Sequence, residues 1–368
     1  MRPTWADIDL DAVAHNVREL CRIVAPAQLC AVVKADGYGH GAVPVARAAV
    51  EAGADWLAVA LVEEGRVLRA AGIDAPVLVL SEPRPKEMVE VVDSDLTPTV
   101  YSGEGLAAAE AAAIHAGIEL GVHLKVDTGM HRVGALPRDS AMLARAISDK
   151  LALRLDGVWT HCAVADEPDD PYTDEQLDRF EAVIDELAAA GHRPPFVHAA
   201  NSAVGLAFPR GRYDLVRAGI GIYGIPPSPA LAGLADLRRA MSVRSEVSMV
   251  KRLAAGERVS YGLRWQASTE CTIATVPIGY ADGIRRRLHD VGGEVLIGGK
   301  RRPIAGVVTM DQLMVDCGDD PVATGDEVVL LGAQGDEDIT ATEVAARLDT
   351  IAYEVVCDIE SRVPRRYR

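Results

Sequence analysis

Residues 28–60 read QLCAVVKADGYGHGAVPVARAAVEAGADWLAVA, and this stretch sets the pattern of the N-terminal part of the chain. Its first segment, QLCAVVK (28–34), is a short apolar run, typical of a strand buried on both faces of a parallel sheet. GAVPVARAAVEAG (41–53) has helical character and ends on a glycine, the residue that commonly lies just past a helix. WLAVA (56–60) is a second apolar run, so the stretch predicts one strand–helix–strand unit.

The same alternation extends on both sides of this unit. Before it, apolar residues between Leu10 and Val24 recur at steps of three and four, which is the spacing of one helical face. After it, further strand-like runs lie at 77–81, 96–100, 121–127, 155–161, 195–201 and 213–220, with helix-like stretches such as 102–117 and 174–191 between them. Eight strand-then-helix repeats predict an α/β fold of the (β/α)8 barrel type rather than an open sheet.

The pattern changes after about residue 236. Short β-rich segments punctuated by glycine and proline lie at 242–253, 270–280, 293–316, 326–332 and 353–363. In this part of the chain only TATEVAARL (340–348) looks helical. The sequence therefore predicts two domains, a barrel over 1–236 and a mostly antiparallel β domain over 237–368.

The charge, the apolar runs and the cysteine spacing of the chain limit which partners, locations and metal sites we expect. The chain has 54 acidic against 38 basic residues, a net charge of −16, which argues against a nucleic acid or an anionic membrane as a partner. No secretory signal and no apolar run near the ~20 residues of a membrane span is visible, so we expect a cytoplasmic protein. The six cysteines show neither CxxC pairs nor metal-finger spacing, so neither disulfides nor a metal site is predicted.

Polar side chains follow several predicted barrel strands, at the end where such barrels carry their active sites. Lys34 ends the first strand, and a partly desolvated amine there is suited to forming a Schiff base. The other strand-end candidates are Lys125, Asp127, Arg132, His161, Asn201, Ser202 and Arg217. Taken singly, each has a structural alternative such as an ion pair, a core histidine or a helix N-cap. Together with a helix start at Ser202 that suits a phosphate, they indicate a pyridoxal 5'-phosphate (PLP) site.

Longer motifs make this hypothesis specific. AVVKADGYGHG (31–41) resembles the PLP-attachment motif of the alanine racemase family. Eight further segments match other motifs of that family, and they occur in the same order along the chain. They are KVDTGMHRVG, THCAVAD, HAANSA, VRAGIGIYG, VSYG, GYADG, TMDQ and YEVVCDI. The resemblance therefore covers nearly the whole chain.

The resemblance implies an isomerase that interconverts L-alanine and D-alanine with two bases and supplies D-alanine for peptidoglycan. It implies that Lys34 carries PLP and is one base, and that Tyr261 is the other base, acting in the active site of the partner subunit of a homodimer. The implied cofactor-binding residues are Lys34, Tyr38, His161, Asn201, Ser202, Arg217, Gly219, Ile220 and Tyr353. The implied substrate-binding residues are Lys125, Arg132, Tyr280 and Met310. In some members the lysine that matches Lys125 is carbamylated.

Two positions depart from the family pattern. His131 stands where glycine is frequent, next to Arg132, and Val307 stands where many relatives carry arginine. These changes leave open a racemase of another amino acid, such as serine. Arg285–Arg287, with Tyr280 and Asp282 before them, either shape substrate access or form a solvated strand end.

Three other classes remain as alternatives. A basic amino-acid decarboxylase would place a carboxylate at the pyridine nitrogen, where the resemblance places Arg217. A non-catalytic PLP-binding barrel would need no second base and no β domain. A Schiff-base aldolase on a barrel would not explain Arg217 or Tyr261.

Overall fold

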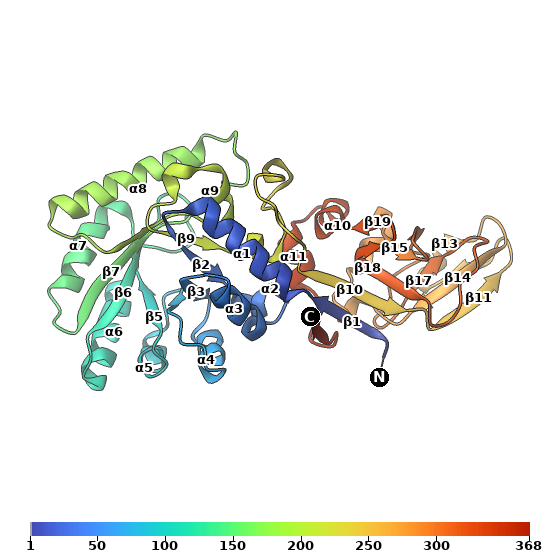
Figure 1. The fold of residues 1–368 in the computed structure, drawn as a ribbon, viewed down its shortest axis with the longest axis horizontal. Coiled ribbons are helices and arrows are strands. Elements are labelled where there is room, and N and C mark those ends of the chain that lie inside the picture. Colours follow the sequence, from blue (N-terminus) through green and yellow to red (C-terminus); the bar gives the residue numbers. More distant parts are fainter. Residues whose placement is uncertain (1) are drawn as a thin grey trace. The chain divides into compact units, whose positions relative to one another are not determined.

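The computed structural model describes residues 2–368, which form two compact units (Figure 1). The first, here called the barrel unit, contains Asp11–Gly37 and Ala42–Arg238. The second unit contains the residues up to Leu10, Tyr38–Gly41 and Arg239–Arg368.

Eight parallel strands form the sheet of the barrel unit. They are β2 (Gln28–Val32), β3 (Trp56–Val59), β4 (Val77–Val79), β5 (Thr97–Val100), β6 (Leu120–Lys125), β7 (Leu153–Trp159), β8 (Phe196–His198) and β9 (Leu215–Ala218). Neighbouring strands follow the order β9, β2, β3, β4, β5, β6, β7, β8. The two ends of this order meet through the Asp214 N–H to Val197 carbonyl bond (3.0 Å) and the Arg217 N–H to Ala200 carbonyl bond (3.0 Å). All eight predicted strands and the barrel are thus confirmed.

Helices connect the strands of the barrel unit. They are α1 (Leu10–Val24), α2 (Lys34–Tyr38), α3 (Ala42–Glu51), α4 (Val62–Ala70), α5 (Met88–Asp93), α6 (Gly103–Ala116), α7 (Pro137–Ser148), α8 (Tyr172–Ala189) and α9 (Ser202–Ala207). Short 3-10 turns are η1 (Pro85–Glu87), η2 (Pro209–Gly211), η3 (Ile220–Tyr223) and η4 (Pro229–Leu231). Helix α6 shows why its sequence is helical: the Ser102 side chain accepts the Gly105 N–H, and Gly117 ends the helix at φ 68°.

Buried apolar side chains lie on both faces of the barrel sheet. Leu57, Leu78, Leu124 and Trp159 are among its largest fully buried side chains. Helices cover the outside of the sheet (Figure 1), and buried side chains fill its inside, so the apolar runs of the sequence are continuous.

The second unit is built from three sheets. The largest has the order β16 (Lys300–Pro303), β15 (Glu294–Ile297), β18 (Glu327–Gln334), β10 (Met241–Glu246), β1 (Thr4–Ile8) and β20 (Arg365–Tyr367), with β19 (Glu337–Ile339) pairing β18. A three-stranded sheet joins β11 (Met249–Leu253), β14 (Cys271–Val276) and β17 (Leu313–Asp316), and β12 (Arg258–Val259) pairs β13 (Trp265–Gln266). Only the β1–β20 pair is parallel among these described strands, which confirms the mostly antiparallel prediction.

The helical segments of the second unit include one that the sequence pattern misassigned. They are α10 (Ala341–Leu348), α11 (Ala352–Cys357), η5 (Tyr261–Leu263), η6 (Tyr280–Asp282) and η7 (Arg286–Val291). Helix α10 confirms the prediction for 340–348, but α11 lies where 353–363 was expected to be β-rich. In α11 the buried residues Ala352, Val355 and Val356 recur at three- and four-residue steps. A helix of six residues is too short for its period to be told from a strand by sequence alone.

Candidate active site

Lys34 lies in an unusual backbone segment directly after β2. Ala35, Asp36, Gly37 and Tyr38 all adopt positive φ values between 50° and 62°, a conformation that L-residues rarely adopt in succession. Side chains of the barrel unit hold this turn in place. Glu64 accepts the Ala35 N–H (2.6 Å), and Asp36 accepts the Ala42 N–H (2.9 Å). Such strain persists where the surroundings fix it, and it is frequent at functional sites.

Arg217, on β9, is buried in the barrel with no carboxylate bound to it among residues 2–368. Its guanidinium donates to the backbone carbonyls of Thr160 (2.9 Å) and Ala199 (3.0 Å) and contacts two histidine rings. Burial lowers the pKa of Arg217 to about 10, which still leaves it cationic near neutral pH. The positive charge is therefore held by dipoles rather than neutralised.

The contacts of Arg217 fix the tautomers of a row of histidines. A guanidinium can only donate, so His198 Nδ1 (2.8 Å) and His161 Nδ1 (3.3 Å) both accept from it. The proton of His198 then lies on Nε2, which faces His123 Nδ1 at 2.9 Å. Burial, followed by the charge of Arg217, lowers the pKa of both His161 and His198 well below the usual value. His161 is thus neutral, with an N–H on Nε2.

Lys125, the last residue of β6, lies in the same positively charged region. Its side chain is 5% exposed, and burial, followed by the charges of Arg217 and Arg132, lowers its pKa to about 7. Two basic side chains lie over the indole of Trp159, with Lys125 Nζ 4.2 Å and Arg217 Cζ 4.5 Å from its ring centre. The charge of Lys34 adds to the lowering at both Lys125 and His161, which places the predicted strand-end residues in one site.

Arg132 lines a small crevice of the barrel unit together with Lys125, Asp127 and His161. It is exposed and makes no ion pair with a carboxylate within residues 2–368, so it suits an anionic ligand. The neighbouring His131 adopts φ 54° and turns its ring to Asp127, with Nδ1 3.6 Å from the carboxylate. The imidazole ring therefore lies beside Asp127.

A cradle suited to a phosphate lies at the ends of β8 and β9. Ser202 Oγ accepts the N–H groups of Gly219 (2.9 Å) and Gly221 (3.4 Å). The Ile220 N–H is buried and donates to no protein acceptor within residues 2–368. An unsatisfied buried donor next to a hydroxyl fits a phosphate oxygen. Asn201, rather than Ser202, is the N-cap of α9, because its side chain accepts the Val204 N–H.

The other predicted residues lie in the second unit. Tyr38 and Tyr353 form a tilted aromatic pair with ring centres 6.1 Å apart, and burial raises the pKa of Tyr38. Tyr261 is 72% exposed at the tip of a strained loop in which Ser260 has φ 67°. The Ser260 hydroxyl donates to the carbonyl of Val307 (2.6 Å), whose side chain is buried. The backbone of Val307 thus supports the Tyr261 loop.

Met310 and Tyr280 lie on two segments that bind each other. Tyr280 donates its N–H to the Thr309 carbonyl (2.9 Å), and Ala281 donates to the Met310 carbonyl (3.0 Å). Met310 is 52% and Tyr280 41% exposed. The Met310 N–H itself has no protein acceptor within residues 2–368 and is free to bind a carboxylate.

Sequence analysis missed His123, His198 and Trp159, which support Arg217 and Lys125. The available signal was a polar or large aromatic side chain inside an apolar strand, as in GVHLK, FVHAA and GVWTH. No group of three or more His, Cys, Asp or Glu side chains within residues 2–368 is placed to hold a metal ion. Across the same residues, every helix is too short or too polar to cross a membrane.

Comparison with known families explains this combination of features. Residues 8–227 match the family described as "Alanine racemase, N-terminal domain", and residues 240–367 match "Alanine racemase, C-terminal domain". The chain belongs to the alanine racemase family. The family resemblance expected from the sequence motifs is therefore confirmed.

Individual alanine racemases are similar to this chain over its whole length. The protein from Symbiobacterium thermophilum is 52% identical, with 100% of this chain and 97% of the relative covered. The crystal structure of alanine racemase from a D-cycloserine-producing Streptomyces lavendulae has a TM-score of 0.95 at 42% identity, covering 100% and 97% of the two chains. The Bacillus anthracis alanine racemase with bound L-Ala-P has a TM-score of 0.94 at 40% identity, covering 100% and 95%.

Proposed function

We propose that this protein is an alanine racemase that interconverts L-alanine and D-alanine with PLP and two bases. The observation that carries the proposal is the match to both domains of the family together with a carboxylate-free Arg217 in the barrel. A cytoplasmic location and a supply of D-alanine for peptidoglycan are parts of the same proposal.

The residues at the strand ends suit PLP. The amine of Lys34 would hold it, and the cradle of Ser202, Gly219 and Ile220, with the phenols of Tyr38 and Tyr353, would hold its phosphate. When bound, PLP supplies an electron-withdrawing ring that makes the Cα proton of alanine acidic. Asn201 supports this cradle by capping α9.

Racemisation requires a proton to leave one face of Cα and another to arrive on the opposite face. In the proposed assignment the Lys34 amine serves one face and the phenol of Tyr261, from the partner subunit, serves the other. His161 suits the second base because its Nε2 carries an N–H, which a phenolate oxygen can accept. Arg132, with Lys125 beside it, and the Met310 N–H bind the substrate carboxylate, and Tyr280 lines the access on the partner's side.

Arg217 controls which reaction follows proton removal. In the proposed assignment Arg217 would face the pyridine nitrogen of PLP and would donate a hydrogen bond to it without giving up its proton, so the ring would withdraw electrons less strongly. The four contacts of the guanidinium with Thr160, Ala199, His161 and His198 hold it in place for this role. Weaker withdrawal limits transamination, which a carboxylate at this position would favour.

The central test is to incubate the PLP-loaded protein with L-alanine in heavy water, resolve the enantiomers and locate deuterium. D-alanine carrying deuterium at Cα is the expected product, and Lys34→Ala and Tyr261→Phe are expected to abolish its formation. Retention of L-alanine without exchange refutes the proposal. The same assay with serine, lysine and arginine then identifies another amino acid as substrate or leaves a non-catalytic PLP-binding barrel.

The proposal includes a homodimer with shared sites, which the exposure of Tyr261, Leu263 and Met310 supports. Mixing inactive Lys34→Ala and Tyr261→Phe chains tests it. Random exchange makes half of the dimers mixed, each with one intact site of two, so about a quarter of the wild-type activity should return. No recovery after verified exchange contradicts the shared site.

A further inference from the structure

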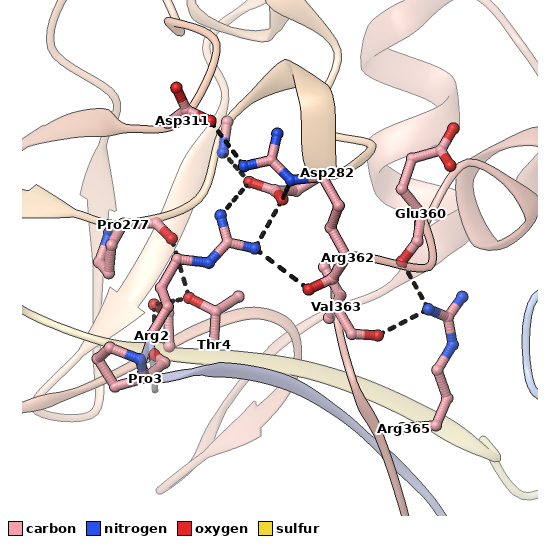
Figure 2. A network of polar contacts seen from close by, with 12 residues as sticks. Arg2, Pro3, Thr4, Pro277, Asp282, Asp311, Glu360, Arg362, Val363 and Arg365 are labelled. Carbon is pink, nitrogen blue, oxygen red and sulfur yellow. Dashed lines mark hydrogen bonds and ion pairs between the residues drawn. The ribbon is translucent and has the colours of Figure 1, made fainter.

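The second unit contains a buried carboxylate that the proposed chemistry does not use. Asp282 is fully buried, and Arg2 donates to both of its oxygens at 2.8 and 2.6 Å. The Gly279 N–H donates to the same carboxylate at 2.9 Å, and Arg362 Nε lies 3.4 Å from it. Figure 2 shows Arg2 and Arg362 converging on Asp282. A buried charge satisfied by two guanidiniums and a backbone donor is held rigidly.

Arg362 connects this carboxylate to the turn that carries Met310. Its Nη2 donates to the carboxylate of Asp311 at 2.7 Å, and Asp311 directly follows Met310 (Figure 2). The turn is closed by the Thr309 N–H, which donates to the Gln312 carbonyl at 2.9 Å. One guanidinium thus joins the loop of Asp282 to the turn 309–312.

The loop of Asp282 also binds the turn through its backbone. Tyr280 and Ala281 donate to the carbonyls of Thr309 and Met310, as described above. The two backbones approach so closely at Gly279 that a Cβ there would lie 2.3 Å from the Thr309 carbonyl oxygen. Only glycine fits at this position. The carbonyls of Thr309 and Met310 are therefore both held by hydrogen bonds, while the Met310 N–H has no protein acceptor within residues 2–368.

We infer that Asp282, Arg2 and Arg362 form a positioning cluster for the substrate carboxylate: they fix the turn 309–312 so that the Met310 N–H is oriented before substrate arrives. The inference rests on the proposed function, in which this N–H binds the carboxylate in the partner's site. A donor that is already oriented needs no reorganisation on binding. Because the cluster acts through the turn, it supports carboxylate binding and leaves proton transfer at Cα nearly unchanged.

The test separates carboxylate binding from turnover in the PLP-loaded enzyme. Arg362→Met removes the link between Asp282 and Asp311. The Arg362 side chain is 46% exposed, and Arg2 still binds Asp282 in this variant. Asp311→Asn keeps the shape of the side chain and weakens the same connection. The matched control is Arg252→Met, since Arg252 is 45% exposed and pairs with Glu270 and Asp319 elsewhere in the second unit.

For each variant we would measure kcat and KM for L-alanine and the inhibition constant of propionate, which is alanine without its amino group. Arg362→Met is expected to raise KM and the propionate constant together by about tenfold, with kcat changing less than about twofold. Asp311→Asn should shift both constants less in the same direction, and Arg362→Lys should restore part of the loss. Arg252→Met should leave both constants unchanged.

An unchanged propionate constant in folded Arg362→Met enzyme overturns the inference. So does an equal shift in Arg252→Met, because the effect would then be a general loss of order in the second unit. Wild-type enzyme that does not racemise alanine refutes the proposed function, and the inference fails with it. Active wild-type enzyme with unshifted variants refutes the positioning cluster alone.

Discussion

Replacing Lys125 by methionine should stabilise the cofactor-free protein near neutral pH. The pKa of Lys125 is about 7 in the folded protein against 10.5 when unperturbed, with burial as the largest cause. Between these pH values the unfolded chain binds more protons at this residue, so stability rises as the pH rises. At 1.36 kcal/mol per pH unit, burying Lys125 costs about 4 kcal/mol at pH 7 and about 2 kcal/mol at pH 9.

Lys125→Met keeps the length of the side chain and removes this cost. The contact with Trp159 offsets about 1 to 2 kcal/mol of it when Lys125 is charged, so the expected gain at pH 7 is about 2 to 3 kcal/mol. The gain should shrink by about 2 kcal/mol between pH 7 and pH 9. In this range the unfolded wild-type chain keeps the Lys125 proton and the folded protein has released it, so the free-energy cost of that release falls as the pH rises.

Equilibrium urea unfolding at pH 7, 8 and 9 measures this difference at one fixed protein concentration. The buffers must be free of CO2, because a neutral amine near pH 7 reacts with it. Lys86→Met is the matched control, since Lys86 is exposed. The free energy of unfolding of this variant should depend on pH as that of the wild type does. Parallel pH dependences for wild type and Lys125→Met, or a less stable variant at pH 7, would refute the reasoning.

Three further changes test other parts of the site. His131→Gly should stabilise the protein by about 0.5 kcal/mol, because glycine adopts φ 54° without strain; the urea midpoint at pH 8 measures it, and destabilisation would contradict the strain argument. Ser202→Ala leaves the buried Gly219 and Gly221 N–H groups without their acceptor, so it should lower the free energy of unfolding by about 1 to 3 kcal/mol. The variant should also lose PLP on dialysis. An unchanged melting temperature and cofactor content would argue against the cradle. Arg217→Glu should raise pyruvate formed per racemisation about tenfold, equal to about 1.4 kcal/mol in relative barriers; unchanged partitioning would remove the proposed control by Arg217.

Local sequence patterns predicted the barrel well. Apolar runs such as 28–34 and 56–60 reflect strands covered on both faces. Such a run can be recognised within a few consecutive residues of the sequence. Strand β1 (Thr4–Ile8) was missed because its partners, β10 and β20, lie in the distant C-terminal part of the chain. Its short, partly polar sequence carries no period of its own.

For the candidate site, the sequence supplied the residue types and the structure supplied their neighbours. Lys34, Lys125 and Arg217 were identified because they end or interrupt apolar strands. Their electrostatics were not visible, because the lowered pKa of Lys125 and the tautomer of His161 depend on burial and on charges from other strands. Long-range contacts of this kind leave no spacing in the sequence.

The sequence by itself determined the repeating strands of the barrel, the β-rich second part and the order of the family motifs. Only the tertiary structure decided that Lys125 and Arg217 both lie over the indole of Trp159 and that Arg362 joins Asp282 to the turn of Met310. The physical reason is range: strand and helix periods arise from bonds between near neighbours, whereas burial and charge pairing act between residues that folding alone brings together.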